Sequence, residues 1–217
     1  MTSDLFDELP QADTTDQLLA PGAVLLRGFA LARCDALLAG FEAVTAQASL
    51  RHLVTPGGHT MSVAMSNCGA LGWVSSPSGY SYTPNDPANG KPWPAMPLDW
   101  FELAESAAAQ AGYANFKPDA CLVNQYLPGA KMGLHQDRDE KDFAQPIVSV
   151  SLGLPAVFLF GGLKRTDKPQ RVRLVHGDVV VWGGSSRLAF HGVAPLADGM
   201  HSVWGRRRVN LTFRRAA

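Results

Sequence analysis

The chain has 217 residues, of which 46% are hydrophobic and 18% are charged, so it is long and apolar enough to form one sizeable globular domain. Its 19 basic and 19 acidic residues give a formal net charge of zero, which excludes a strongly basic protein that binds nucleic acid through bulk charge alone. Five acidic residues and no Lys or Arg lie in residues 1–20, so the rest of the chain is weakly basic and could bind a polyanion locally.

Cys34, Cys68 and Cys121 stand far apart and form no CxxC pair, which predicts a reducing compartment rather than a disulfide framework. The acidic start does not resemble a secretory signal, and no apolar run approaches the roughly 20 residues that span a membrane. We therefore expect a cytoplasmic protein that uses no membrane and needs no obligate protein partner. Residues 1–20 are expected to be an acidic N-terminal extension.

Residues 31–47 have apolar side chains at helical spacing and predict the first helix. The next stretch, to about residue 96, is rich in Gly, Pro, Ser and Asn but also contains Trp73 and Tyr80. Such a composition is typical of hairpins and long loops with aromatic tips. Residues 97–112 begin with Pro97, are rich in alanine and end at Gly112, which predicts a second helix.

From residue 120 onward, short apolar or alternating runs are separated by turn residues. These runs are 120–127, 146–154, 156–162, 171–175, 178–184, 187–193 and 207–215. Many short strands without intervening helices predict a mainly β (α+β) fold, a sandwich or a barrel. We expect one domain over residues 21–217, in which the N-terminal half supplies helices and covering loops to a β-core of about residues 118–215.

The stretch GLHQDRDEKD, residues 133–142, places His135 and Asp137 two residues apart at the end of an apolar run. On a strand this spacing puts both side chains on the same face. Two histidines and one carboxylate with open positions suit a non-haem Fe(II) site. A single H-x-D triplet also arises by chance, and taken alone a solvated charged turn is the commoner interpretation.

A second triplet, His176-Gly177-Asp178, lies between two strand-like runs, and we expect it to form a structural hairpin turn. The best candidate for a third ligand is His191, because it lies near the end of the late run 187–193. The remaining histidines lie in loop-like stretches and are more often simply exposed.

The last run alternates between a polar and an apolar face. The polar face carries Arg208, Asn210, Thr212 and Arg214, and the apolar face carries Val209, Leu211 and Phe213. If the apolar face packs on the core, the arginines point into or near the barrel interior, where they need anionic partners. A ligand with two carboxylates would supply both partners, and beside an iron site that ligand would be 2-oxoglutarate. An exposed edge strand with solvated arginines is the alternative for this strand taken alone.

Several longer words occur in order along almost the whole chain, including TPGGHTMSVAMSNCG, LGW, KPWPAMP, PDACLVNQY, GAKMGLHQDRDE, PIVSVSLGLPAVFLFGGLKR, HGDVVVWGG and RVNLTFR. Through them the chain strongly resembles the AlkB family of Fe(II)/2-oxoglutarate-dependent nucleic-acid dealkylases. The resemblance implies a double-stranded β-helix (jelly-roll) core with N-terminal helices and a nucleotide-recognition lid over about residues 50–96.

The resemblance also implies where the metal and the cosubstrate bind. Iron would be held by His135, Asp137 and His191, and O₂ would be the second cosubstrate. Arg208 would bind the distal carboxylate of 2-oxoglutarate, and Arg214 the carboxylate that chelates iron. The remaining residues of the cosubstrate pocket would be Asn124, Tyr126 and Asn210.

For the substrate, the resemblance implies that the damaged base stacks between Trp73 and the ring of His135. The residues expected to contact the base or the phosphates are Met65, Tyr80, Asp139, Lys131, Lys164 and Arg165. Asp139 would meet the exocyclic amine of the base, whereas Glu140 and Asp142 are expected to be solvated. His59 departs from the aromatic residue of the bacterial archetype, which leaves the substrate range open.

The implied reaction is the repair of N-alkylated bases, such as 1-methyladenine and 3-methylcytosine, in single-stranded DNA, with double-stranded DNA or RNA as alternatives. It would convert 2-oxoglutarate and O₂ to succinate and CO₂, and release formaldehyde from methyl lesions. Three other functions stay open: a 2-oxoglutarate-dependent hydroxylase of another substrate, a nucleic-acid-binding module without catalysis, and, least favoured, a zinc hydrolase.

Overall fold

The computed structural model describes residues 15–217 and contains two facing antiparallel sheets. The larger sheet has eight strands in the order β1-β2-β12-β9-β14-β7-β4-β3. Their bounds are β1 (Gln17–Ala20), β2 (Ala23–Leu26), β3 (Arg51–Val54), β4 (Thr60–Gly69), β7 (Ala120–Tyr126), β9 (Ile147–Gly153), β12 (Val179–Trp182) and β14 (Arg208–Arg214).

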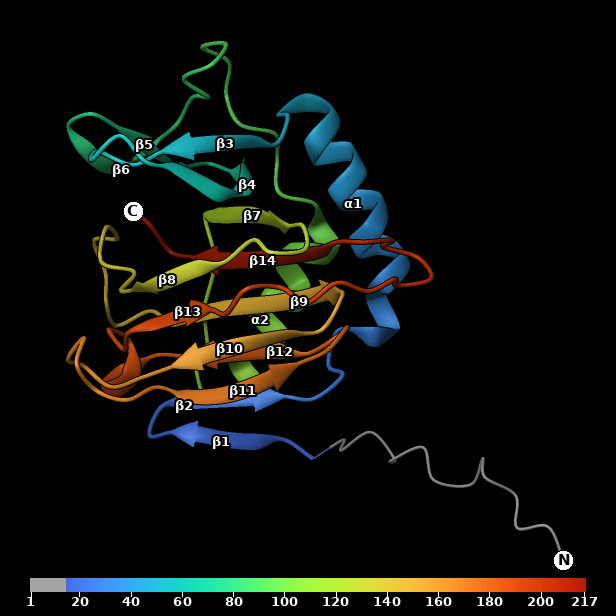
Figure 1. Cartoon of the computed structure of the whole chain (residues 1–217), viewed down its shortest axis with the longest axis vertical. Coiled ribbons are helices and arrows are strands. Elements are labelled where there is room, and N and C mark those ends of the chain that lie inside the picture. The colour runs from blue at the N-terminus through green and yellow to red at the C-terminus, as the bar shows by residue number, and fades with distance from the viewer. Residues whose placement is uncertain (1–14) are drawn as a thin grey trace, which may run out of the picture.

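The smaller sheet has four strands in the order β11-β10-β13-β8 and lies in front of the larger sheet in Figure 1. Its bounds are β8 (Met132–His135), β10 (Ala156–Phe160), β11 (Gln170–Leu174) and β13 (His191–Val193). The chain crosses repeatedly between the two sheets, so the expected jelly-roll core is confirmed.

The alternation within β14 divides the interior into two parts. Val209, Leu211 and Phe213 pack with the helices on one face of the larger sheet, and all three are fully buried. Burying a side chain of this kind stabilises the fold by about 1.5–3 kcal/mol. Arg208 and Arg214 point to the other face, into the space between the two sheets. The strand therefore serves the hydrophobic core and the polar interior at the same time.

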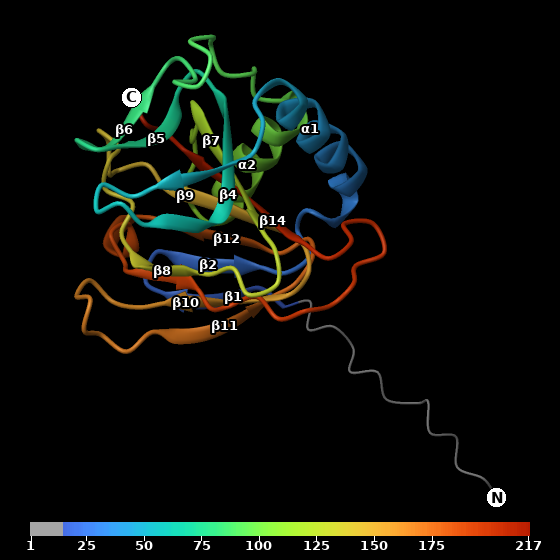
Figure 2. The same ribbon diagram turned by 45° about the horizontal axis from the view of Figure 1, so that its top comes forward.

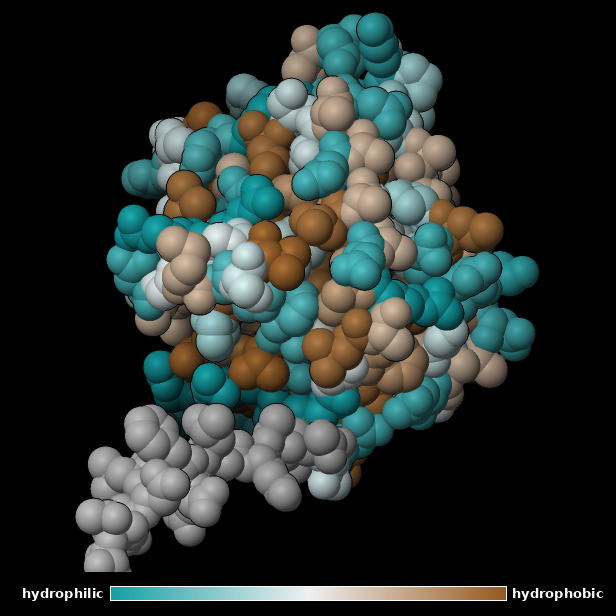
Figure 3. All heavy atoms as spheres, turned by 90° about the vertical axis from the view of Figure 1, so that its right-hand side faces the viewer, coloured by the Kyte–Doolittle hydropathy of each residue, from teal (hydrophilic) through white to brown (hydrophobic). Residues whose placement is uncertain are grey.

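Two helices cover the outer face of the larger sheet, as Figure 1 shows, and they begin and end within a few residues of the predicted positions. They are α1 (Cys34–Gln47) and α2 (Leu98–Gln110). The helices cross closely because Gly40 has no side chain where the indole of Trp100 lies, and a Cβ there would clash with that ring. On the side of the molecule where α1 lies, apolar and polar side chains are interspersed (Figure 3).

The hairpin of β5 (Gly72–Ser76) and β6 (Gly79–Thr83) stands beside β3 and β4 at one end of the larger sheet (Figure 2). The side chain of Asn67 in β4 holds the hairpin in place. Its amide nitrogen donates to the carbonyl of Trp73 at 3.0 Å, and its oxygen accepts from the Trp73 N–H at 2.9 Å. The hairpin is the predicted aromatic lid segment, and its position is set by a strand of the core sheet.

Two expectations about the framework are wrong. The N-terminal half supplies four strands to the larger sheet as well as helices and loops, because β2 pairs with β12 and β4 pairs with β7. The turn around His176 joins β11 to β12, which belong to different sheets, so it is not a hairpin. Residues 1–14 of the acidic extension lie outside the described residues, and no helix in the described part is long and apolar enough to cross a membrane.

Candidate active site

Strand pairing in the smaller sheet brings two histidines together. His135 is the last residue of β8 and lies opposite His191, the first residue of β13. The two ring centroids are 4.4 Å apart. Gly192 permits this close approach, because a Cβ at that position would lie 2.6 Å from the carbonyl oxygen of Met132.

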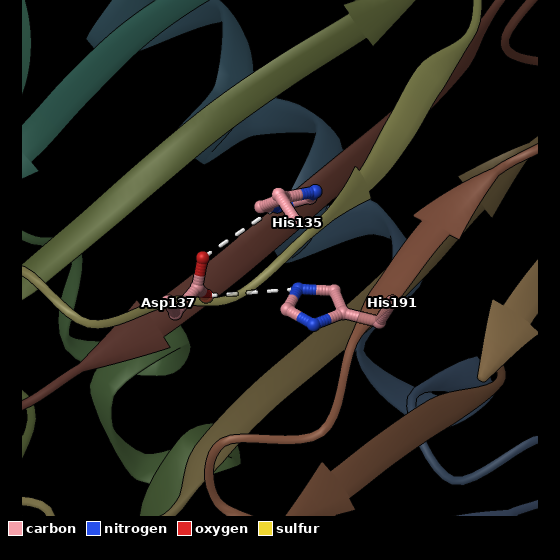
Figure 4. Close-up of side chains that lie close together, drawn as sticks. All are labelled: His135, Asp137 and His191. Atoms are coloured by element: carbon pink, nitrogen blue, oxygen red, sulfur yellow. Dashed lines mark ion pairs between the residues drawn. The ribbon is translucent and has the colours of Figure 1, made fainter. Parts of the chain in front are cut away.

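Asp137 completes the cluster from the loop that follows β8. Its carboxylate oxygens lie 3.6 Å from Nε2 of His135 and 3.8 Å from Nε2 of His191, as Figure 4 shows. The strand ends at His135, where the apolar run meets the charged stretch, so Asp137 does not share a strand face with it, and the loop turns the carboxylate inward instead. Among the described residues, this is the one group of three or more His, Cys, Asp or Glu residues whose donor atoms all lie within 4.8 Å of one another.

The hydrogen bonds behind the two rings suit metal ligation. Nδ1 of His135 contacts the carbonyl oxygen of Gly133 at 2.9 Å, and Nδ1 of His191 contacts that of Ala189 at 3.0 Å. A carbonyl oxygen can only accept, so Nδ1 carries the proton in each ring and Nε2 presents its lone pair to the shared centre. Two imidazoles and one carboxylate in this arrangement match the donor set of non-haem Fe(II) sites.

The charges of the cluster also favour a cation. Burial by itself would raise the pKa of Asp137, but the Arg214 guanidinium and the two imidazoles hold it below its ordinary range. Burial and the neighbouring His135 ring lower the pKa of His191 to about 4. At neutral pH the carboxylate is therefore ionised and the buried imidazole is neutral, which are the protonation states that a metal requires.

The lowered pKa of His191 predicts how the metal-free protein responds to acid. The folded state takes up the proton at a pKa of about 4 and the unfolded chain near 6.5, so stability falls as the pH falls through this window. We expect this group to lower the free energy of unfolding by about 2 kcal/mol between pH 7 and pH 5, with a slope that approaches about 1.4 kcal/mol per pH unit only once the pH is below 6.5. Urea unfolding with a chelator present measures it.

His191→Gln is the control, because glutamine does not titrate and should remove this part of the slope. Asp137 does not obscure the window, since its lowered pKa costs stability only below its ordinary value of 3.8. An equal slope in the wild type and His191→Gln would contradict the prediction.

A pocket between the two sheets adjoins the cluster, and its walls contain the five residues predicted to bind the cosubstrate. These residues are Asn124, Tyr126, Arg208, Asn210 and Arg214. Arg208 is fully buried, and only its NH2 group has a partner, the hydroxyl of Ser151 at 2.9 Å. Its Nε and NH1 have no partner, and neither does Oδ1 of Asn124. Unpaired buried polar groups are costly, and the two free donors of Arg208 indicate an anionic ligand, whereas Oδ1 of Asn124 can only accept a hydrogen bond.

The two arginines of β14 differ in their neighbours. Arg214 donates from Nε to the carboxylate of Asp137 at 2.9 Å, which places it next to the cluster of His135, Asp137 and His191. Arg208 lies over the ring of Tyr126, 5.0 Å from its centroid, and burial lowers its pKa because no carboxylate compensates its charge. One guanidinium beside the metal and one at a distance suit a ligand with two carboxylates, one of which chelates the metal.

A family model described as the 2OG-Fe(II) oxygenase superfamily matches residues 22–214. The chain is 57% identical to "Alpha-ketoglutarate-dependent dioxygenase AlkB" of Salmonella typhimurium, over 99% of this chain and 98% of that protein. It is 55% identical to the protein of the same name from Escherichia coli K12, over 98% of each. The chain belongs to the AlkB family of Fe(II)/2-oxoglutarate-dependent dioxygenases. Fe(II), 2-oxoglutarate and O₂ are therefore its cofactor and cosubstrates.

More distant relatives agree with the fold. The solved structure of OsALKBH1 matches with a TM-score of 0.79 at 30% identity, and covers 93% of this chain and all of that one. The "tRNA demethylase abh1" of Schizosaccharomyces pombe is 31% identical over 66% of this chain and 52% of that protein. A 2OG-Fe(II) oxygenase family structure from Burkholderia pseudomallei, at 15% identity and a TM-score of 0.55, shares the fold alone.

In this AlkB-family chain the predicted base-contacting residues come from several elements: Trp73 and Tyr80 from the lid hairpin, Met65 from β4, His135 from β8 and Asp139 from the loop after β8. Trp73 stacks on Tyr80, with ring centroids 4.9 Å apart and planes at 22°. The indole N–H of Trp73 donates to the carboxylate of Asp139 at 2.8 Å, so the lid aromatic is fixed to the loop that carries Asp137. Met65 lies with Trp73 in the wall of a hollow beneath the hairpin.

The predicted phosphate contacts are solvent-exposed. They are Lys131, Lys164 and Arg165, and none of them forms an ion pair with the residues that the structure describes. The Arg165 guanidinium lies over the ring of Phe190, 5.9 Å from its centroid. Their role in binding a nucleic-acid backbone stays a prediction, as does the stacking of a base between Trp73 and His135.

The expectation that Glu140 is solvated is wrong. Its side chain is buried, accepts a hydrogen bond from the hydroxyl of Tyr82 at 2.7 Å, and pairs with Arg187 at 3.0 Å and Arg214 at 3.3 Å. Tyr82 and Arg187 were not predicted from the sequence. A glutamate in a charged run and an arginine after a Gly-Ser turn carry no local signal of burial. Asp142 is half-buried and caps a turn by accepting from the N–H of Ala144 at 2.9 Å.

The second H-x-D triplet has structural contacts instead. The Asp178 carboxylate accepts from Arg27 at 2.8 Å, and from the backbone N–H groups of Gly28 at 3.0 Å and Val175 at 2.9 Å. Nδ1 of His176 accepts from the N–H of Gly153 at 3.1 Å. Nε2 of His176 contacts Sγ of Cys34 at 3.1 Å, so both ring nitrogens and the carboxylate of this triplet already have partners.

Proposed function

We propose that this AlkB-family dioxygenase removes alkyl groups oxidatively from N-alkylated bases, of the 1-methyladenine and 3-methylcytosine type, in single-stranded DNA. The carrying observation is the His135–Asp137–His191 cluster, which lies between a buried and partly unpaired arginine and an aromatic lid. The names of two relatives, a "tRNA demethylase" and a "DNA N(6)-methyladenine demethylase", support a nucleic-acid substrate, with double-stranded DNA and RNA as the alternatives.

The residues of the site divide into metal ligands and cosubstrate-binding residues. His135, Asp137 and His191 hold Fe(II), Arg208 holds the distal carboxylate of 2-oxoglutarate, and Arg214 holds the other. When bound, Fe(II) with 2-oxoglutarate and O₂ supplies the oxidation of the N-alkyl carbon, which yields succinate and CO₂ and releases a methyl group as formaldehyde. The target base is hidden within a duplex, so it must be single-stranded or flipped out, and Trp73 provides a stacking surface for it.

The site also bears on the rival functions. A binding module without catalysis would not need a preformed triad or a buried arginine with unpaired donors. A hydroxylase of a small molecule would leave the aromatic lid unexplained. We further propose a cytoplasmic location, which the three free cysteines support.

One assay tests the proposal. The protein is incubated with Fe(II), 2-oxoglutarate and a single-stranded oligonucleotide that contains 1-methyladenine, and succinate and restored adenine are measured together. We expect the two products in equal amounts. Succinate that forms equally with and without the oligonucleotide, with no restored adenine, would contradict the proposal and favour another substrate. Parallel duplex and RNA oligonucleotides rank the alternative substrates.

Asp139 is expected to select damaged bases by their charge. Methylation at N1 of adenine or N3 of cytosine makes the base cationic, and an ionised carboxylate in the lid region favours a cation. Asp139→Asn keeps an acceptor for the indole N–H of Trp73 but removes the charge. We expect repair of the cationic lesions to fall roughly 10- to 100-fold, from a charge-assisted hydrogen bond of about 1.5–3 kcal/mol.

Neutral etheno-adenine provides the comparison, and its repair by Asp139→Asn should change much less. Asp139→Ala removes the tie to Trp73 as well, so both kinds of lesion should suffer in that variant. Equal losses for cationic and neutral lesions in Asp139→Asn would rule out charge selection and leave Asp139 only the task of positioning Trp73.

A further inference from the structure

The loop of residues 136–146 carries two of the proposed functional carboxylates, Asp137 and Asp139, but contains no helix or strand. A strand is held by the ladder of its neighbours, whereas this loop must be held by side chains. Its main support comes from a residue far away in the sequence, Arg187, which follows the short 3₁₀ turn Gly184–Ser186.

The Arg187 guanidinium bridges the loop at three points. Its Nε donates to the carbonyl oxygen of Gln145 at 2.9 Å, its NH1 to that of Asp137 at 2.8 Å, and its NH2 to the carboxylate of Glu140 at 3.0 Å. The side chain is 3% exposed and lies over the ring of Phe143, 5.4 Å from its centroid. The bonds to Asp137 and Glu140 are buried and the bond to Gln145 is partly buried, so the clamp is largely shielded from water, where hydrogen bonds to a charged group are strongest.

The three bonds of Arg187 to Asp137, Glu140 and Gln145 form a clamp across the loop, and Glu140 connects this clamp to two further elements. It accepts from the hydroxyl of Tyr82 on the lid hairpin at 2.7 Å, and it pairs with Nε of Arg214 on β14 at 3.3 Å. Arg214 in turn holds the side chain of Asp137. Asp137 is thus fixed twice, through its backbone carbonyl by Arg187 and through its carboxylate by Arg214.

We propose that Arg187 is a positioning residue that holds this loop so that Asp137 meets the two histidines and Asp139 meets the lid. The inference rests on the proposed iron site. Arg187 itself does not touch the cluster of donor atoms, and it acts through the backbone of a ligand residue. The planar guanidinium fork has several donors at fixed angles and can reach three separate acceptors at once. The single ammonium of a lysine could reach only some of these acceptors.

The test compares Arg187→Met and Arg187→Lys with the wild type. Co(II) serves as the probe metal in anaerobic titrations without cosubstrate, and hydrogen exchange reports on the loop in the metal-free protein. We expect Arg187→Met to weaken Co(II) binding about 10- to 100-fold, as is usual when an outer partner of a metal ligand is lost. Exchange should become faster in residues 136–146, while β9 stays protected. Arg187→Lys should also weaken Co(II) binding, because charge alone does not restore the fork.

Arg27→Met is the matched control. Arg27 also forms a largely buried ion pair, with Asp178, but it has no hydrogen bond to the loop. It should lower the stability and leave Co(II) affinity and loop exchange unchanged. Wild-type Co(II) affinity and loop exchange in Arg187→Met would overturn the proposal, as would equal weakening by Arg27→Met. If Arg187→Met does not fold, wild-type behaviour of Arg187→Lys overturns it in the same way.

A failure of the underlying iron site can be told apart. His191→Ala removes a proposed ligand and leaves the clamp intact, so its Co(II) affinity should collapse without faster exchange in residues 136–146. Unchanged Co(II) affinity in His191→Ala would refute the iron site, while the hydrogen exchange of Arg187→Met would still decide whether the clamp holds the loop.

Discussion

His191→Ala is expected to abolish metal binding and dealkylation, whereas His176→Ala keeps both. Nε2 of His191 faces the carboxylate of Asp137, and its lone pair is free because Nδ1 contacts the carbonyl oxygen of Ala189. Loss of this ligand should weaken Co(II) or Fe(II) binding by at least about 100-fold, since even the loss of an outer partner costs up to about that factor. Titration of the purified metal-free variants measures it.

His176→Ala is a demanding control, because His176 belongs to the same H-x-D pattern. Its Nδ1 accepts from the N–H of Gly153, and removing it leaves a partly buried donor unpaired, at a cost of about 1–3 kcal/mol of stability. The variant should therefore melt earlier but bind metal as the wild type does. Equal loss of metal in both variants would refute the assignment of the first triplet as the iron site.

Arg208→Met is expected to remove 2-oxoglutarate binding without unfolding the protein. The Arg208 guanidinium is fully buried, and no carboxylate of the described residues pairs with it. A buried charge without a counter-ion destabilises the protein in the absence of ligand, so a methionine of similar volume should leave the ligand-free protein at least as stable. Isothermal titration with 2-oxoglutarate and urea unfolding of the same samples give the two readouts.

Arg208→Lys separates charge from geometry. A lysine keeps the charge but cannot form the paired hydrogen bonds of a guanidinium. The 2-oxoglutarate concentration needed for half-saturation should therefore rise roughly 10- to 100-fold, while Co(II) still binds. Unchanged 2-oxoglutarate affinity in both variants would rule out Arg208 as the carboxylate-binding residue. A strong loss of stability in Arg208→Met would show instead that the arginine supports the fold.

The local sequence pattern was sufficient to predict the helices and strands in which side chains recur at a regular spacing. The spacing of Leu37, Phe41 and Val44 predicts one face of α1, and the alternation in β14 predicts that one side joins the core while the other carries arginines. These periods of about 3.6 and 2 residues follow from backbone geometry, so a helix or strand face can be predicted from them without knowledge of tertiary contacts. The series of β-runs likewise predicted a sandwich or a barrel, and the resemblance to the AlkB family implied the jelly roll.

Only the tertiary structure determined how the irregular loop is held. The spacing of His135 and Asp137 would put both on one face if the strand continued, but the strand ends at His135, and Arg187 and Arg214 hold Asp137 so that its carboxylate faces inward. Glu140 looked like one of several solvated charges, yet it is buried against two arginines and a lid tyrosine. A loop has no period, and its partners are 40 or more residues away, so no local pattern reports its burial.

The same reason explains the N-terminal strands. Residues 17–20 and 23–26 are too short to be recognised by alternation. Residues 23–26 become strand β2 because β12, far along the chain, offers an open edge, and residues 17–20 pair in turn with β2. The sequence by itself thus determined the residue types of the site and the periodic elements that bear most of them. The pairing of β8 with β13, and the clamp across the loop, required contacts that only the folded chain brings together, because they join segments separated by about 50 residues.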